Sequence, residues 1–160
     1  MNKFFTRIYQ SNIAIALVIA IFFIGDRFLK LVAIKNQFAP AFPLIGKWLS
    51  FKFYPNRQIA FSLPLEGPIL NILISGLILL VITYIIYLIY ISQKQKRTSV
   101  ILLSLIAVGA ISNFLDRLLN GFVVDYLELT NFSVFNLADA MISISALLLI
   151  IKNIYTSKPT

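Results

Sequence analysis

Residues 113–139 have the sequence NFLDRLLNGFVVDYLELTNFSVFNLAD, and this stretch decides how the rest of the chain is interpreted. It contains three aspartates, Asp116, Asp125 and Asp139, and the segments on either side of it are almost wholly apolar. Carboxylates this close to hydrocarbon are costly, so each of them requires a partner or a function. The same stretch carries three further polar side chains of interest: Asn113, Arg117 and Asn136.

Composition indicates the class of protein. The chain has 160 residues, of which 59% are hydrophobic and 12% are charged, whereas a soluble domain carries about 25% charged residues. We therefore predict a single integral membrane domain over residues 1–160. The chain has neither cysteine nor histidine, which excludes disulfides, cysteine–histidine catalysis and thiolate or imidazole metal sites. We expect no metal and no cofactor.

Four apolar segments of helical length predict an all-α membrane protein built as a four-transmembrane-helix bundle. We predict these spans at residues 11–34, 68–92, 99–118 and 136–152. A secretory signal peptide is the alternative for the first span, and the continuation of its apolar run past any small-residue cleavage site disfavours it.

The two connections on one side of the bundle, residues 36–67 and 119–135, differ in amino-acid composition. Residues 36–67 are rich in proline and glycine, and apolar residues alternate with polar ones from Leu49 to Tyr54. This pattern predicts a small β element at the membrane surface, with Trp48 and Tyr54 as interfacial anchors. Residues 119–135 are expected to form a short re-entrant or loop region.

Charge indicates the orientation of the bundle. Four spans place both termini on one side, which collects Lys3, Arg7, Lys94, Lys96, Arg97, Lys152 and Lys158. The positive-inside rule then predicts cytoplasmic termini, and it explains the net charge of +8 without a nucleic-acid partner. With this topology the polar residues of the spans gather at a single, extracytoplasmic level, as a site facing one leaflet would require. They are Asp26, Arg27, Lys30, Asn71, Asn113, Asp116, Arg117, Asp125, Asn136 and Asp139.

Asp125 and Asp139 are candidates for catalysis. The chain turns back between them, so they can face each other, and two facing carboxylates share one proton. One can then act as a base on water while the other, protonated, polarises a carbonyl, which is the chemistry of aspartyl peptide hydrolysis. The alternative is that each aspartate caps a helix or pairs with a cation. Asp139 lies in the first turn of a predicted helix, where an anion is favoured.

The remaining polar residues have structural alternatives of their own. Asp26 and Lys30 are spaced i, i+4, which suits an ion pair with a structural or substrate-orienting role. Asp116 would be neutralised by Arg117 or Lys30, and Arg117 could alternatively bind a lipid phosphate. Asn56 would bond either its own turn or a peptide substrate.

Five segments, in order along nearly the whole chain, resemble motifs of lipoprotein signal peptidase, the signal peptidase II family of bacterial membrane aspartyl proteases. GDRFLK (25–30) resembles its Asp-x-x-x-Lys, and NRQIAFSL (56–63) its Asn-x-Gly-x-Ala-Phe-Ser. GAISNFLDR (109–117) is similar to Gly-Ala-x-Gly-Asn-x-x-Asp-Arg, with Ser112 in place of a glycine. GFVVDYLEL (121–129) resembles Gly-x-Val-Val-Asp-Phe-Ile, and FNLADAMI (135–142) resembles Phe-Asn-x-Ala-Asp-x-x-Ile. Gln58 also replaces a motif glycine.

The resemblance implies a function and a set of site residues. It implies cleavage of a prolipoprotein signal peptide immediately before a diacylglyceryl-modified cysteine, by a bundle with an extracytoplasmic β-cradle and a short periplasmic helix. It places catalysis on Asp125 and Asp139, and gives supporting or substrate-binding roles to Asp26, Lys30, Asn56, Asn113, Asp116, Arg117, Asn136 and Ala138. The expected setting is the bacterial inner membrane, with a monomeric enzyme, membrane lipids as partners and peptide inhibitors such as globomycin.

Two other function classes use the same residues. A small proton-coupled transporter would expose the Asp125 and Asp139 region to both sides of the membrane. A non-catalytic scaffold would use these carboxylates only in ion pairs.

Overall fold

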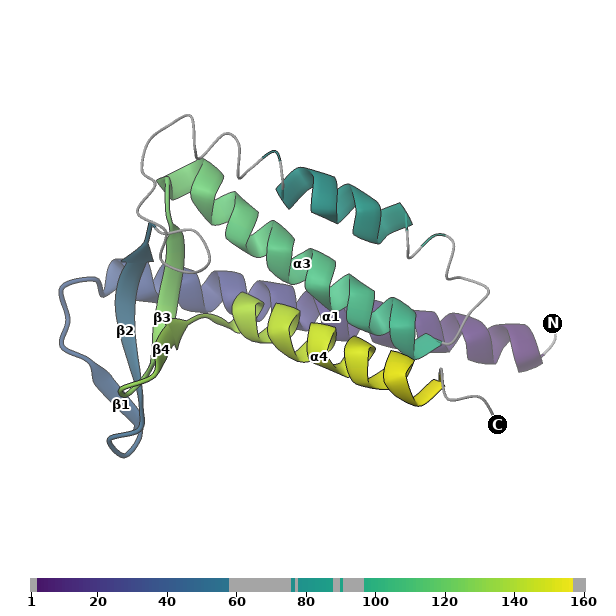
Figure 1. Ribbon diagram of the computed structural model, residues 1–160, viewed down its shortest axis with the longest axis horizontal. Coiled ribbons are helices and arrows are strands. Elements are labelled where there is room, and N and C mark those ends of the chain that lie inside the picture. Colours follow the sequence, from purple (N-terminus) through teal and green to yellow (C-terminus); the bar gives the residue numbers. More distant parts are fainter. Residues whose placement is uncertain (1–2, 58–75, 77, 88–89, 91–96, 157–160) are drawn as a thin grey trace.

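Three long helices lie side by side, and an antiparallel sheet closes one end of them (Figure 1). The helices are α1 (Lys3–Lys35), α3 (Arg97–Asn120) and α4 (Leu137–Thr156). α1 begins and α4 ends at the end of the molecule opposite the sheet (Figure 1). The computed structural model describes residues 3–57, 76, 78–87, 90 and 97–156, and only the backbone of residues 3–14, 97 and 156.

Two of the described helices are long and apolar enough to cross a membrane. They are Thr98–Asn120, with a mean hydropathy of 2.0, and Leu137–Tyr155, with a mean hydropathy of 1.8. α1 covers the first predicted span and extends past it at its start. Within the second predicted span Ile78–Tyr87 is helical, and most of the remainder lies outside the described residues.

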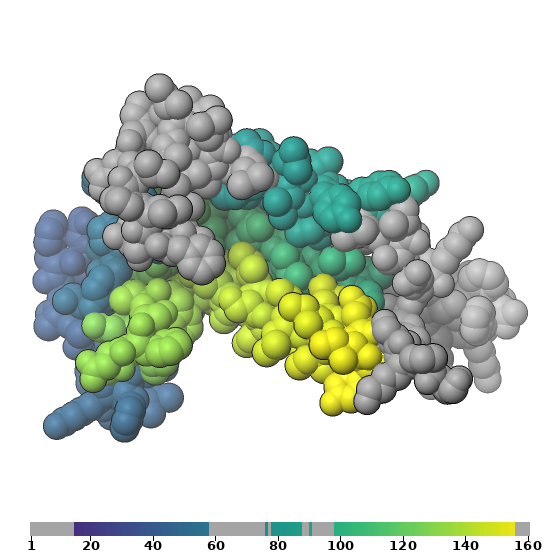
Figure 2. All heavy atoms as spheres, viewed as in Figure 1, coloured from purple at the N-terminus to yellow at the C-terminus, as the bar shows by residue number. Residues whose placement is uncertain are grey.

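The outer surface of the helices is apolar. On α4, Leu147, Ile150 and Ile154 are each more than half exposed, and α4 lies open along one face of the molecule (Figure 2). A helix with apolar side chains around most of its circumference is typical of a membrane span, because lipid can cover the side that protein does not.

Gly109 allows α3 and α4 to pack closely near the sheet. A Cβ added at this glycine would lie 2.7 Å from the backbone oxygen of Ala138 and 2.9 Å from Cγ1 of Ile142. Small residues at such a contact let two helix backbones approach, which is how helices associate in membranes. The first turn of α4 is thereby held against α3.

The prediction that residues 119–135 form a re-entrant or loop region is wrong, because most of this segment is β-strand. They contain β3 (Val123–Leu129) and β4 (Ser133–Phe135), which join β1 (Phe42–Ile45) and β2 (Leu49–Asn56) in the order β1-β2-β3-β4. The molecule is therefore not purely α-helical, and its sheet draws on both connections. The physical reason is that Val123, Val124 and Tyr126 favour strand, and β2 offers an edge for pairing.

Gly121 turns the chain from α3 into β3. Its φ is +76°, and its N–H donates to the carbonyl of Arg117 at 3.0 Å. A glycine in the left-handed region just past a helix end is a common helix stop. This stop brings the last turn of α3, which carries Asp116, next to the start of β3, which carries Asp125.

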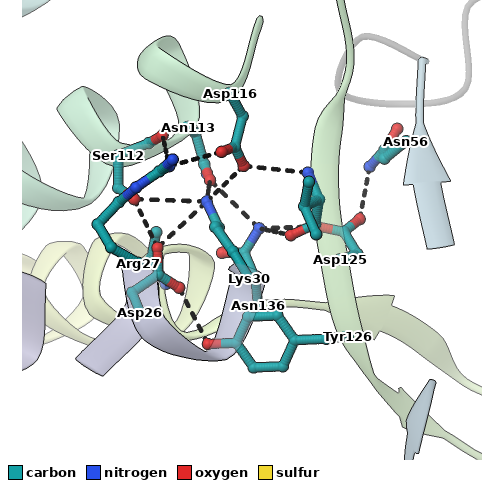
Figure 3. Close-up of polar contacts among 12 residues, drawn as sticks. Asp26, Arg27, Lys30, Asn56, Ser112, Asn113, Asp116, Asp125, Tyr126 and Asn136 are labelled. Carbon is teal, nitrogen blue, oxygen red and sulfur yellow. Dashed lines mark hydrogen bonds and ion pairs between the residues drawn. The ribbon is translucent and has the colours of Figure 1, made fainter. Parts of the chain in front are cut away.

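The core under the sheet joins it to α1. Ala33 of α1 is fully buried with Val124 and Tyr126 of β3, and Phe51 of β2 and Leu137 of α4 pack against this group. The end of α1 is thus fixed against β3, and the charged residues one and two turns earlier on α1 point into the space between α3, α4 and the sheet (Figure 3).

Candidate active site

Lys30 lies at the centre of a buried polar network (Figure 3). Its Nζ lies 2.8 Å from Oδ2 of Asp116 and 3.1 Å from Oδ2 of Asp26. It also donates to Oδ1 of Asn113 at 2.8 Å. The residue is fully buried, so the two carboxylates supply the opposite charge that a buried ammonium group requires. The predicted i, i+4 ion pair is present.

Asp116 receives two cations and one backbone amide. Its Oδ1 lies 2.5 Å from Nη1 of Arg27, and its Oδ2 accepts the N–H of Val124 at 3.0 Å. The latter bond ties β3 to α3 one residue before Asp125. Lys30 therefore neutralises Asp116 as predicted, but the second cation is Arg27. Arg117 makes no ion pair with Asp116 in the described residues.

Asp26 has all its acceptor positions in use. Oδ1 accepts the hydroxyl of Tyr126 at 3.0 Å and the N–H of Ala138 at 3.1 Å. Oδ2 accepts the hydroxyl of Ser112 at 2.6 Å in addition to the Lys30 ion pair. One carboxylate thus connects α1, α3, α4 and the sheet, and it is fully buried.

The first turn of α4 places Asp139. Asn136 caps this helix: its Oδ1 accepts the N–H of Asp139 at 2.9 Å, and its own N–H donates to Oδ2 of Asp139 at 3.2 Å. This reciprocal pair has the geometry of a capping box. Oδ1 of Asp139 accepts the side-chain amide of Asn113 at 2.7 Å. The capping alternative is therefore right for one oxygen of Asp139, and the other oxygen faces Asn113.

Asp125 projects from β3 between β2 and α4, and two asparagines hold its carboxylate. Asn56 donates to Oδ2 at 2.8 Å, and Asn136 donates to Oδ1 at 2.7 Å. Of the two alternatives for Asn56, neither includes this bond to Asp125. Asn136 contacts both candidate aspartates, so it couples the capped end of α4 to the middle of β3.

An irregularity in the sheet brings Asn56 to Asp125. The register shifts between Phe51, opposite Leu127, and Tyr54, opposite Asp125. Side chains alternate along a strand, so an extra residue moves every later side chain of β2 to the other face. Without this shift, Asn56 would lie on the face away from Asp125.

The environment of Asp125 changes its acidity. Burial raises the pKa of Asp125 to about 6, the nearby carboxylate of Asp139 also raises it, and the bonds from Asn56 and Asn136 lower it. A carboxyl group with a pKa near 6 can hold or release a proton close to neutral pH, which acid–base catalysis requires.

Arg117 is half-buried and interacts electrostatically with three carboxylates, those of Asp139, Asp125 and Asp116. It is the nearest cation of α3 to the candidate pair. Its guanidinium makes no hydrogen bond within the part of the chain that the structure describes, so it adds positive charge to the site without fixing either aspartate in place.

The fold brings all ten predicted site residues into one cluster. Three further members of the cluster were not among the predicted site residues: Arg27, Ser112 and Tyr126. Tyr126 offered one clue, because a phenol in a strand as apolar as VVDYLEL needs a buried hydrogen-bond partner. Within the described residues, no group of three or more acidic, cysteine or histidine side chains could hold a metal ion.

An apolar helix bundle with three buried aspartates and a fourth, half-buried one at the same end is typical of an integral membrane enzyme of the aspartic type. A family model described as signal peptidase (SPase) II matches residues 18–155. The chain is 32% identical to the lipoprotein signal peptidase of Chlorobium phaeobacteroides (strain BS1) over 147 residues, covering 82% of this chain and 90% of that protein. It is 30% identical to that of Sinorhizobium fredii (strain NBRC 101917 / NGR234) over 160 residues, covering 96% and 93%.

Two solved structures, each described as a bacterial membrane enzyme, have the same fold. One has a TM-score of 0.79 at 24% identity and covers 92% of this chain and 93% of its own. The other has a TM-score of 0.71 at 27% identity and covers 92% and 94%. The chain belongs to the signal peptidase II family of membrane aspartic proteases, whose name implies lipoprotein maturation.

Proposed function

We propose that this enzyme removes the signal peptide of a prolipoprotein by cutting immediately before a diacylglyceryl-modified cysteine, with Asp125 and Asp139 activating the attacking water. One observation carries this proposal. Of the four aspartates at the site, only Asp125 and Asp139 are held by amide donors with no ion pair in the described residues. Asp26 and Asp116 are paired with Lys30 and Arg27.

The chemistry divides between the two aspartates by their surroundings. Asp139, in the first turn of α4, takes a proton from water, and the water oxygen attacks the scissile carbonyl carbon. Asp125, whose pKa is raised to about 6, holds a proton below that pH and donates it toward the carbonyl oxygen. As the tetrahedral intermediate collapses, one of its hydroxyl groups returns a proton to Asp125 and re-forms a carbonyl, the C–N bond breaks, and Asp139 gives its proton to the leaving amine. The two residues then resume their starting states.

Neighbouring residues orient this pair. Lys30 donates to the oxygen of the Asn113 side chain, which leaves the nitrogen of that amide to donate to Asp139. Asn136 donates to Asp125. Asn56 and Arg117 lie at the edges of the site, where they would contact the peptide, and the backbone N–H of Ala138 donates to Asp26. Asp26 and Asp116 hold the frame.

The proposed function also implies where the protein lies and how it is oriented in the membrane. Four spans would carry the chain across the bacterial inner membrane, with cytoplasmic termini and the sheet end facing outward. The substrate helix would enter from the membrane while its lipid chains stay in the bilayer. We expect a monomer, membrane lipids as its surroundings, no cofactor, and inhibition by globomycin-type peptides.

The direct test compares wild type with Asp125→Asn and Asp139→Asn on a synthetic prolipoprotein peptide bearing a diacylglyceryl cysteine. Both variants should lose cleavage by at least about 1,000-fold, because each removes one half of the acid–base pair. Lys152→Met, at the far end of α4, is the control and should cleave at the wild-type rate. If either aspartate variant cleaved at the wild-type rate, the aspartates would be structural, as in a scaffold.

The transporter class has its own test. Single cysteines can be introduced at exposed positions near the site, at Asn120 at the end of α3 for example, into this cysteine-free chain. A membrane-impermeant thiol reagent should label them from the periplasmic side only. Labelling from both sides would favour a transport pathway over a one-sided protease site.

A further inference from the structure

We propose that Tyr126 is a positioning residue for the reaction: its hydroxyl fixes the first turn of α4, and with it Asp139 and Asn136, against the strand that carries Asp125. The inference rests on the proposed function. The Tyr126 hydroxyl makes no hydrogen bond to Asp125 or Asp139 in the described structure, and it acts on them through its bonds to Asp26 and Leu137.

The hydroxyl of Tyr126 both donates and accepts a hydrogen bond. It donates to Oδ1 of Asp26 at 3.0 Å and accepts the backbone N–H of Leu137 at 3.0 Å. The side chain is fully buried. Burial raises the pKa of Tyr126 above its usual range, as does the neighbouring Asp26 carboxylate. The phenol therefore keeps its proton at every assay pH, and its donor and one acceptor position are both filled.

The bond to Leu137 has a parallel one residue away. Tyr126 and Asp125 are neighbours on β3, so their side chains leave opposite faces of the strand. The hydroxyl of Tyr126 bonds the backbone N–H of Leu137, and the carboxylate of Asp125 bonds the side chain of Asn136. Asn136 directly precedes Leu137 on the chain. Two adjacent residues of β3 are thus hydrogen-bonded to two adjacent residues at the start of α4. A shift of the helix start would disturb both contacts together.

Leu137 N–H is a group that the helix itself cannot satisfy. The first N–H groups of any α-helix lack intrahelical partners. In α4 the first goes to Tyr126, the second, from Ala138, goes to Asp26, and the third, from Asp139, goes to Asn136. Removing the phenol oxygen leaves a buried donor unpaired, and the helix start must move to find another acceptor.

Ser112 provides a matched comparison. Its hydroxyl donates to Oδ2 of the same Asp26 at 2.6 Å, and it too is fully buried. Unlike the hydroxyl of Tyr126, it makes no bond to α4 or to the sheet: its other contact is a 3.4 Å bond from Lys30. Both residues stand where the motifs they resemble have a residue without a hydroxyl, phenylalanine for Tyr126 and glycine for Ser112. Tyr126→Phe and Ser112→Ala therefore each delete one hydroxyl donor to Asp26, but only the first deletes a bond to α4.

The test measures kcat, KM and thermal stability for wild type, Tyr126→Phe, Ser112→Ala and Asp125→Asn on the same diacylglyceryl prolipoprotein peptide. Tyr126→Phe should lower kcat by about tenfold, because misplacing a reacting group by a fraction of an ångström has effects of this order. Its KM should stay close to the wild-type value. Ser112→Ala should lose at least as much thermal stability but a clearly smaller part of kcat.

The pH profile separates positioning from stability. If the start of α4 moves, the bond from Asn136 to Asp125 weakens, and the pKa of Asp125 rises because that bond lowers it. The alkaline limb of kcat/KM should therefore move to higher pH in Tyr126→Phe and stay in place in Ser112→Ala. The charged or titratable groups around Asp125 remain in both variants: Lys30 on α1, Arg117 on α3, Asp139 on α4 and Tyr54 opposite it on β2.

A second variant tests the same bond from the other partner. Replacing Leu137 by its α-hydroxy acid analogue converts the N–H to an ester oxygen and leaves both side chains intact. This change should reproduce the kcat loss of Tyr126→Phe, and the two changes combined should lose little more than either alone.

The outcomes separate the two hypotheses. If wild type cleaves, Asp125→Asn does not, and Tyr126→Phe matches wild type in kcat and pH profile, then Tyr126 is structural and only this inference is overturned. If Ser112→Ala lowers kcat as much as Tyr126→Phe, the link to α4 is not what matters, and the inference fails as well. If wild type does not cleave the peptide, the proposed function itself is wrong.

Discussion

The four aspartates of the site form two pairs with opposite surroundings. Asp26 and Asp116 contact cations: Lys30 bridges both of them, and Arg27 adds to Asp116. In the described structure Asp125 and Asp139 receive only amide N–H groups. The first pair meets direct opposite charge, whereas the second pair is held by neutral amide donors. One molecule thus uses two carboxylates in ion pairs, and the proposed mechanism uses the other two to exchange protons.

The two pairs are coupled through asparagine side chains. Lys30 donates to Asn113, and Asn113 donates to Asp139, so the ion-paired cluster orients the candidate catalytic pair without contacting it. An amide transmits orientation but no net charge. We therefore expect substitutions in the ion-paired cluster to affect stability first, and substitutions among the asparagines to affect catalysis first.

Lys30→Met should have the largest effect on stability. It leaves Asp26 without a cation and Asp116 with only the half-exposed Arg27, and breaking a buried ion pair from one side costs about 3–5 kcal/mol. The free energy of unfolding, measured by SDS titration from mixed micelles, should fall by about this amount.

The matched control neutralises the orphaned charges. The triple variant Asp26→Asn, Lys30→Met, Asp116→Asn leaves no carboxylate unpaired, so it should recover a large part of the lost stability. If the triple variant were no more stable than Lys30→Met alone, the ion pairs would not be the reason for the loss, and the contrast between the two pairs would not hold.

Much of this arrangement could be predicted from the sequence. Apolar segments of helical length predict the helices, because the periodicity and the length of a span are local properties. The positions of Asp26, Asn113 and Asp139 near span ends place them at one level, as the structure has them. The motifs predict two roles for the four aspartates, which remain a prediction; the structure gives the two groups different partners.

The parts that the sequence could not give depend on contacts between distant segments. Pairing of β2 with β3 joins residues about 70 positions apart, and a local pattern carries no information on it. The register shift that turns Asn56 toward Asp125 is equally invisible. Arg27 as the second partner of Asp116, in place of the adjacent Arg117, depends on how α1 packs against α3.

Asn136→Ala should lower the rate of cleavage more than the stability, the opposite of what we expect for Lys30→Met. It removes the donor to Asp125 and the cap of α4, and the loss of an N-cap costs about 1 kcal/mol. Cleavage should fall by about 100-fold, because both aspartates lose a contact that orients them. Unfolding and kcat measured on the same preparation check this. A loss of stability as large as that of Lys30→Met, with kcat nearly retained, would contradict the division of roles.

Asn56→Ala should have the smallest effect, and it acts through acidity. With Asp125 as the protonated member of the pair, kcat/KM should decline above a pH of about 6, as this group loses its proton. The bond from Asn56 lowers the pKa of Asp125, so removing it should raise that pKa further and move the alkaline limb to higher pH. Ser50→Ala is the control, because Ser50 lies on the same strand and bonds Glu128 instead; its limb should not move. A limb that moved to lower pH in Asn56→Ala would mean that Asp125 is not the group that titrates there, and Asp139 would then have to carry the proton.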